Sequence, residues 1–217
     1  MTKKIKVFVQ NSIRVNTEKG NVYIDPFEMQ EEPHDAAFIL VTHDHFDHFS
    51  PESIEKVANK NTVLVVPENM LEKSKDAAKF VSETVTVKPD EKRTINGLEL
   101  ETIPSYNINK KFHPKAAGWV GYIVITDGKR IYIAGDTDAT PEALKVKCDI
   151  ALIPIGGTYT MDSKEAAEFI NTIKPAVAIP VHYGKVVGSM DDGKNFANLV
   201  KAPVKVQIAN KIRVKTG

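Results

Sequence analysis

Three of the six histidines and two aspartates of the chain lie in one short stretch, Thr42-His43-Asp44-His45-Phe46-Asp47-His48. His43 and His45 are two residues apart, so in extended backbone their side chains point to the same side. Asp47 continues this alternation, and His48 turns to the other side. The stretch can therefore offer two imidazoles to one metal ion, and a carboxylate with an imidazole to a second. Imidazole and carboxylate ligands suit zinc, and also iron or manganese.

A metal site is favoured over a merely histidine-rich surface loop, because the stretch follows an apolar run and has further candidate ligands downstream. Asp136 follows the apolar run 131–135, and His182 follows the run 177–181. In open α/β sheets the carboxyl ends of strands collect at one edge, so residues distant in sequence can meet there. Asp25 also ends an apolar run. It either terminates that strand or lies beneath the histidines and accepts a hydrogen bond from one of them.

The elements that must position these residues alternate between strands and helices, which predicts an α/β layer arrangement. Strands are expected over 4–9, 13–15, 22–24, 36–41, 62–66, 121–125, 130–134, 149–153, 176–179 and 204–208. Helices are expected over 51–58, 67–80, 162–173 and 192–200, with a short helix after Thr140-Pro141. Residues 83–88, 92–95 and 98–105 alternate like strands of an antiparallel sheet. Asn96-Gly97 and Asp127-Gly128 are typical hairpin turns.

Composition indicates a soluble globular protein, with 42% hydrophobic and 26% charged residues in 217 positions. We expect a single domain over residues 1–217. The net charge of +1 gives no reason to expect long nucleic acid or a membrane as a partner. A single cysteine, Cys148, permits no intrachain disulfide, and no signal peptide or membrane-spanning segment is visible. These features favour a cytoplasmic protein.

The order of motifs resembles the metallo-β-lactamase superfamily. H-x-H-x-D-H after a strand, then Ala134-Gly135-Asp136-Thr137, then a late strand ending in His182, agree with that family over nearly the whole chain. Within it, the chain is similar to a small cytoplasmic branch that includes ascorbate-6-phosphate lactonase and related uncharacterised zinc-dependent hydrolases. The stretches that carry this likeness are 105–107, 118–119, 134–138 and 156–162. The resemblance implies an αββα sandwich, in which helices flank two mixed sheets and a metal site lies at one edge.

The resemblance also implies a ligand set for two divalent metal ions, zinc first and manganese or iron(II) as alternatives. His43, His45 and His113 would bind one ion, Asp47, His48 and His182 the other, and Asp136 both. Asp47 and Asp136 would be the catalytic residues. The third histidine often follows glycine in this family, whereas here it stands in Phe112-His113-Pro114.

The expected activity is cleavage of an ester-like bond, in a lactone or a phosphoester, by a metal-activated hydroxide. Two alternatives stay open: a phosphodiesterase acting on a small nucleotide or lipid, and a metal-binding module without hydrolytic activity. Tyr106, Asn107 and Tyr159 are candidate substrate-binding residues, since their loops are expected near the site. Lys110, Lys111 and Lys185 could attract a small anionic substrate, although a solvated surface position is favoured for them. A homo-oligomer is compatible with the sequence.

Overall fold

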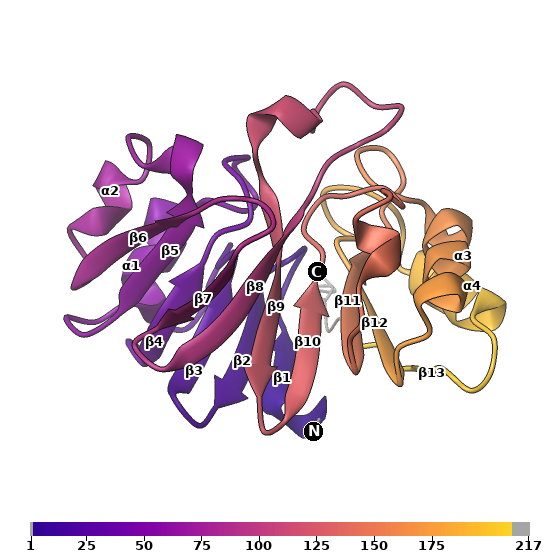
Figure 1. The fold of residues 1–217 in the computed structure, drawn as a ribbon, viewed down its shortest axis with the longest axis horizontal. Helices are drawn as coiled ribbons and strands as arrows, with labels where there is room; N and C mark the ends of the chain where they lie inside the picture. Colours follow the sequence, from indigo (N-terminus) through magenta and orange to yellow (C-terminus); the bar gives the residue numbers. More distant parts are fainter. Residues whose placement is uncertain (1, 210–217) are drawn as a thin grey trace, which may run out of the picture.

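The computed structural model describes residues 2–209 and contains two mixed β-sheets packed face to face with helices on both outer faces (Figure 1). The first sheet has the order β1-β2-β3-β4-β5-β6. Its strands are β1 (Ile5–Val7), β2 (Ile13–Thr17), β3 (Gly20–Ile24), β4 (Ala36–Leu40), β5 (Val63–Pro67) and β6 (Glu83–Val87). The first three strands are antiparallel neighbours, and β3 to β6 pair in parallel.

The second sheet repeats this mixed design, in the order β13-β12-β11-β10-β9-β8-β7. Its strands are β7 (Lys92–Ile95), β8 (Leu98–Pro104), β9 (Val120–Thr126), β10 (Lys129–Ile133), β11 (Ile150–Pro154), β12 (Val177–Val181) and β13 (Lys205–Val206). Strands β7 to β10 are antiparallel neighbours, and β10 to β13 are parallel. The predicted αββα sandwich is therefore confirmed.

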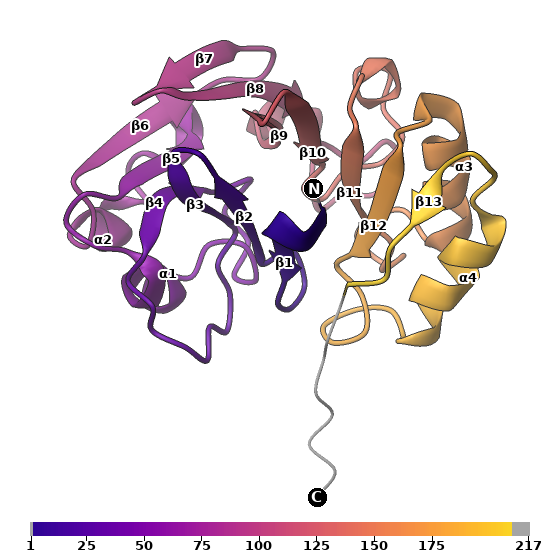
Figure 2. The same ribbon diagram turned by 90° about the horizontal axis from the view of Figure 1, so that it is seen from below.

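Within residues 2–209, four α-helices cover the outer faces, one pair on each sheet (Figure 2). They are α1 (Pro51–Val57), α2 (Lys75–Ala78), α3 (Ser163–Ile173) and α4 (Asp191–Leu199), and short 3₁₀ turns lie at Thr2–Lys4, Glu68–Met70, Lys115–Ala117 and Ala143–Lys145. The Ser50 hydroxyl caps α1, and Asp162 with Glu165 forms the expected capping box of α3. No helix among residues 2–209 is both long and apolar enough to cross a membrane.

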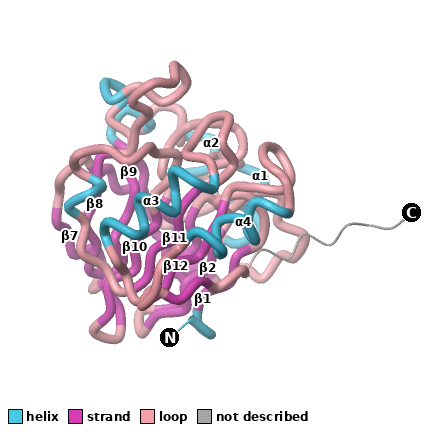
Figure 3. Tube along the Cα trace, turned by 90° about the vertical axis from the view of Figure 1, so that its right-hand side faces the viewer, coloured by secondary structure: helices cyan, strands magenta, loops and turns pink. Residues whose placement is uncertain are grey.

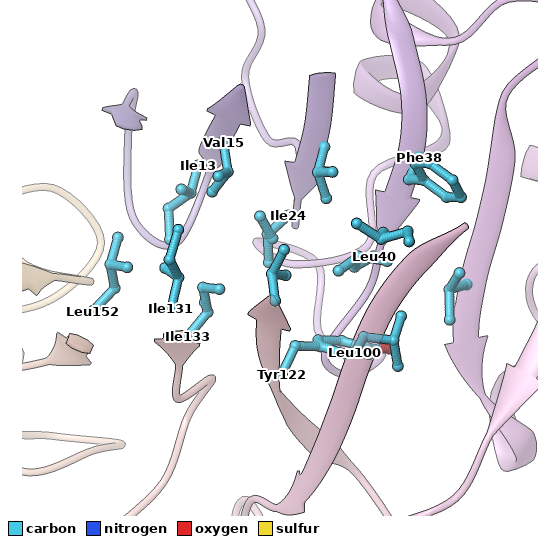
Figure 4. Packing of buried hydrophobic residues seen from close by; sticks show 14 of the residues in the cluster. Ile13, Val15, Ile24, Phe38, Leu40, Leu100, Tyr122, Ile131, Ile133 and Leu152 are labelled. Atoms are coloured by element: carbon cyan, nitrogen blue, oxygen red, sulfur yellow. The ribbon is translucent and has the colours of Figure 1, made fainter. Parts of the chain in front are cut away.

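The inner faces of both sheets share one hydrophobic core (Figure 4). Ile13, Ile24 and Leu40 of the first sheet meet Tyr122 and Ile133 of the second. Alternation along the strands directs these side chains inward. The Tyr122 hydroxyl donates to the carbonyl of Val41 over 2.8 Å, which joins the sheets directly beside the histidine stretch. The shared core therefore fixes the strand ends of the two sheets relative to one another.

Three predicted elements are corrected by the structure. The single helix expected over 67–80 is instead a 3₁₀ turn and the short helix α2, because Pro67 still belongs to β5 and the Ser74 hydroxyl donates to the carbonyl of Leu71. β6 pairs in parallel with β5 rather than joining an antiparallel sheet, since α2 forms a crossover between them. The last strand is shorter than the predicted 204–208.

Candidate metal centre

The histidine stretch lies between β4 and α1, and both of its ends are fixed by hydrogen bonds. Val41 N donates to the carbonyl of Val65 in β5 over 2.9 Å, so the stretch starts from a strand inside the sheet. The amides of His48 and Phe49 both donate to the carbonyl of His45, and Ser50 then caps α1. The rings of His43, His45 and His48 lie together just after the end of β4. Figure 3 shows loops gathered along one edge of the sheets.

The other candidate ligands come from ends of strands in the second sheet. Asp136 follows β10 after Gly135, whose φ is +65°. A Cβ at Gly135 would lie 3.2 Å from both Ser105 Oγ and Thr42 Cβ, so glycine suits this close approach. His182 follows β12 directly, and its own φ is +58°. Such a backbone is uncommon for a non-glycine residue and persists only where the surroundings hold it.

His113 lies in the long loop between β8 and β9, which rises above the sheet edge (Figure 1). The amide of Asn107 donates to the carbonyl of His113 over 2.7 Å, closing this loop on itself. The ring of His113 lies with its centroid 4.5 Å from that of His43 and 5.9 Å from that of His45. The departure from the family's usual glycine therefore does not keep His113 from the other candidates.

A first group of possible ligand atoms, all within 4.8 Å of one another, comes from His43, His45, His113 and Asp136. The rings face each other closely: His43 Nε2 is 3.0 Å from His45 Nδ1. The ring nitrogens of His113 are buried and have no hydrogen-bond partner among the described residues. Buried polar atoms normally have partners, so an ion bound to one ring nitrogen of His113 would supply the partner that this nitrogen lacks.

A second group comprises Asp47, His48 and His182. His182 Nε2 lies 3.1 Å from His48 Nε2 and 3.2 Å from Asp47 Oδ2. Asp136 stands between the two groups. Its Oδ1 is 3.4 Å from His48 Nε2 and 3.3 Å from His182 Nε2, and its Oδ2 is 3.9 Å from His43 Nε2. One carboxylate therefore faces both groups, as a residue shared by two ions would.

Asp25 lies beneath the histidines, which decides between the two alternatives for this residue. It is fully buried, and it accepts hydrogen bonds from Thr42 N, Thr42 Oγ1, Asn11 Nδ2 and His48 Nδ1 over 2.6–2.8 Å. His48 Nδ1 must carry a proton to donate to this carboxylate. His48 Nε2 is then the atom left with a lone pair, and it faces the second group.

Thr42 determines which ring nitrogen of His43 carries the proton. Its single hydroxyl proton is donated to Asp25 Oδ2 at 2.6 Å, so Thr42 Oγ1 can only accept from His43 Nδ1 at 2.9 Å. His43 Nδ1 therefore carries the ring proton, and its Nε2 presents a lone pair to the first group. The Asp25–Thr42 pair thus selects the tautomers of two candidate ligands at once.

The two groups differ in their electrostatics. Burial, together with the neighbouring rings of His48 and His113, holds the pKa of His43 well below its usual range. Burial likewise lowers the pKa of His45, and that of His113 to about 3. These three rings are accordingly neutral at pH 7, which is the form that binds a metal ion.

In the second group the neighbouring carboxylates outweigh burial in their effect on the pKa of His48. Burial would lower the pKa of His48, but the carboxylates of Asp136 and Asp25 outweigh it and hold this pKa well above its usual range. Burial would raise the pKa of Asp136, but His182 and His48 lower it instead. Without an ion, these carboxylates favour a second proton on His48, at Nε2, and a metal cation bound there would take the place of that proton. The residues of both groups fit divalent metal ions.

Three residues that sequence reasoning missed also contact the ligands. Gln10 is fully buried, and its Nε2 lies 3.4 Å from Asp47 Oδ2 and 3.5 Å from His182 Nε2. Trp119 packs against His43, His45 and His113 with ring centroids 5.2, 5.0 and 4.4 Å away. Thr42 precedes the first histidine, and that position was its only signal in the sequence.

The predicted substrate-binding residues lie in the expected loops, with most of their donors already engaged. The Tyr106 hydroxyl donates to Glu142 over 2.8 Å, on the outer side of its loop. The Asn107 amide donates to the carbonyl of Tyr159 over 3.0 Å and lies 3.4 Å from Asp138 Oδ1. Tyr159 is 37% exposed, and its ring packs edge to face on Phe112. Their predicted contacts with substrate stay a prediction.

The fold and these candidate ligand groups indicate the metallo-β-lactamase superfamily, and comparison with known proteins agrees. A family model described as a beta-lactamase superfamily domain matches residues 4–182. The chain is 34% identical to a UPF0173 metal-dependent hydrolase from Thermoplasma acidophilum over 177 residues, 76% of each protein. It is 31% identical to another from Pyrococcus abyssi over 205 residues, 86% of this chain and 88% of the relative.

A solved structure from Parabacteroides distasonis, of a protein assigned as a metal-dependent hydrolase, superposes with a TM-score of 0.80. It is 28% identical, and the match covers 95% of this chain and 93% of the other. The chain belongs to the metallo-β-lactamase superfamily, and within it to the UPF0173 metal-dependent hydrolases.

Proposed function

We propose that the protein hydrolyses an ester-like bond, in a lactone or a phosphoester, at a centre of two divalent metal ions. The observation that carries this proposal is the position of Asp136, whose two carboxylate oxygens face different ligand groups. His43, His45 and His113 would hold one ion, and Asp47, His48 and His182 the other. This ligand set consists of imidazole nitrogens and carboxylate oxygens. It suits zinc best, with manganese or iron(II) as alternatives.

Two such ions supply a nucleophile at neutral pH, by lowering the pKa of water to about 7, and polarise the bond to be cleaved. The residues of the chain position the reactants. Asp136 sets the separation of the two ligand groups, and the Asp25–Thr42 pair keeps the rings of His43 and His48 in one orientation. Asp47, which is 6% exposed, can accept a proton from the attacking water, while Gln10 Nε2 restrains its Oδ2.

A small molecule in the cytoplasm is the proposed substrate. A phosphodiester of a nucleotide or lipid is the alternative within the same chemistry, and a metal-binding module without activity is the alternative outside it. The complete set of ligands supports hydrolysis. A metal-binding module without activity would not need a carboxylate that is shared between the two ligand groups.

The proposal is tested by assaying the zinc-loaded protein against lactones, phosphodiesters and thioesters. Asp136→Asn keeps the shape of the side chain but removes its charge, so we expect this variant to bind less metal and to lose hydrolysis while staying folded. Asp127→Asn, at an exposed hairpin, is the matched control and should behave like the wild type. A metal-loaded wild type that cleaves none of these substrates would leave the inactive module as the better interpretation.

A further inference from the structure

The metal centre opens on the side of His45. Among the candidate ligands, His45 alone is not buried, whereas the others in both groups are. Phe46, the next residue, is 68% exposed. The substrate must therefore approach past this part of the histidine stretch.

Two exposed phenylalanines adjoin candidate ligands in the sequence. Phe46 lies between His45 and Asp47, and Phe112, which is 57% exposed, immediately precedes His113. The rings of His45 and His113 are 5.9 Å apart, so the two phenylalanines lie on neighbouring segments. Tyr159 packs edge to face on Phe112 with centroids 5.0 Å apart. We call Phe46, Phe112 and Tyr159 the aromatic rim.

An exposed phenylalanine contributes little to folding, because most of its apolar surface stays in contact with water. Phe46 and Phe112 each pair with one aromatic ring among residues 2–209. Phe46 pairs edge to face with Phe27, at 6.0 Å between centroids, and keeps most of its surface exposed. Apolar surface concentrated beside ligands is typical of a site that buries an apolar ligand.

The charges near the opening give little support to an anionic substrate. Lys110 pairs with Asp138 at 2.8 Å, and Lys185 pairs with Glu28. Lys73 likewise pairs with Asp44 at 2.9 Å. Of the lysines expected to attract an anion, only Lys111 makes no ion pair among residues 2–209.

The arginines of the described chain offer no alternative. Arg14, Arg93 and Arg130 each lie within 4.0 Å of a carboxylate, and each belongs to a strand away from the ligand loops. Recognition of a phosphate or carboxylate usually relies on arginine or lysine side chains that are free to bind it.

We propose that the substrate is an uncharged ester or lactone with an apolar alkyl or aryl group, and that Phe46 and Phe112 determine this specificity. The apolar group lies on the aromatic rim, and the bond to be cleaved lies at the ligand groups. This inference rests on the proposed hydrolysis of an ester-like bond and narrows it to one substrate class.

The first test compares kcat/KM of the zinc-loaded protein for γ-butyrolactone and γ-decalactone, which differ by a hexyl chain. We expect kcat/KM to rise at least about tenfold with the chain, since each buried methylene adds to binding. Phe46→Ala and Phe112→Ala should each remove most of this increase. Leu199→Ala, also at an exposed apolar residue but at the end of α4, should retain it.

The second test does not depend on turnover. 2-Hexyltetrahydrofuran has the shape of γ-decalactone without its carbonyl, so it cannot be hydrolysed. Saturation-transfer NMR with the zinc-loaded protein should show contact through the hexyl protons, strongly reduced in Phe46→Ala and Phe112→Ala but not in Leu199→Ala.

The outcomes separate the two proposals. Hydrolysis of lactones without chain preference and without saturation transfer would overturn the apolar specificity and leave the proposed hydrolysis intact. Preference for an anionic substrate such as bis(4-nitrophenyl) phosphate, unchanged in the two phenylalanine variants, would overturn it as well. Rim-dependent saturation transfer with no hydrolysis of any ester would support apolar recognition and contradict the proposed function.

Discussion

Asp25 and Thr42 show how few residues are needed to orient two metal-binding histidines. Asp25 provides a buried negative charge, and the Thr42 hydroxyl relays its effect to His43 by donating its only proton to the carboxylate. Both oxygens of the Asp25 carboxylate accept hydrogen bonds. The pair keeps the lone pairs of His43 and His48 pointing toward the two ligand groups.

Asp25→Asn tests this role. The amide keeps the size of the side chain but removes the charge that accepts the His48 proton, so we expect metal affinity to fall about 10- to 100-fold. The measurement is competition for zinc against a chelator of known affinity. Asp127→Asn is again the control. Unchanged zinc affinity in a folded Asp25→Asn variant would show that the carboxylate merely terminates β3.

Among single residues, the sequence predicts best those ligands that lie close together in the chain. The spacing of His43, His45, Asp47 and His48 predicts ligands without any knowledge of the fold. His113 could be assigned only through family resemblance, because nothing in Phe112-His113-Pro114 indicates its partners. Gln10 could not be found at all, since its contact with His182 depends on two strand ends that are 172 positions apart.

Among the elements, the β8–β9 loop supplies one ligand of the first group and the aromatic ring that packs against its histidines. It carries His113 and ends in Trp119, the only tryptophan of the chain. The Asp138 carboxylate holds this loop in place by accepting hydrogen bonds from Ile108 N and Lys110 Nζ, each at 2.8 Å. Sequence patterns predicted a loop here but not its folded shape, because the contacts that define it come from residues more than twenty positions away.

Trp119 should report metal binding directly. Its ring packs against all three histidines of the first group, so cobalt bound there should quench its emission as the ion is added. Fluorescence titration of the wild type measures this. His182→Ala, altered only in the second group, should still be quenched by the first ion, and His113→Ala should not. Constant emission while cobalt binds would place the first ion elsewhere.

An ion pair links two strands of the second sheet. Arg130 on β10 binds Glu101 on β8 through two hydrogen bonds of 2.8 and 3.0 Å. These bonds hold the pKa of Glu101 below its ordinary value of 4.5. A lowered carboxyl pKa stabilises the fold above the unfolded-state pKa, and this stabilisation is lost as the pH falls through the folded-state value.

We therefore expect Glu101→Gln to cost about 1 kcal/mol of unfolding free energy at pH 7, a modest value because the pair is partly exposed. The difference from the wild type should shrink as the pH falls below about 4.5. Urea unfolding at several pH values measures it, with the exposed Glu99→Gln as the control. A difference that stays constant down to low pH would mean that packing, not charge, is responsible.

The whole molecule is organised by the meeting of two mixed sheets. The ligands come from both: the histidine stretch follows β4 in the first sheet, and Asp136 and His182 follow β10 and β12 in the second. Cross-links such as His182 N to the carbonyl of Gln10, at 3.0 Å, tie the sheets together at this edge. Neither ligand group is complete until the sheets have packed.

The sandwich itself followed from motif order and from the alternation of strands and helices. The assignment of β6 to the first sheet did not, because alternation in Glu83–Val87 looks the same whether its neighbour is parallel or antiparallel. Pairing partners are set by the crossover through α2, which is a property of the folded chain.

The metal content of the purified protein tests the central claim most directly. After zinc reconstitution and removal of free metal, mass spectrometry of the metal should give about two ions per chain for the wild type. His113→Ala and His182→Ala should each lose about one ion, and cobalt spectra should show that the two variants lose different ones. A wild type that holds one ion with every candidate metal, or a His113→Ala variant that keeps both, would contradict the dinuclear centre described here.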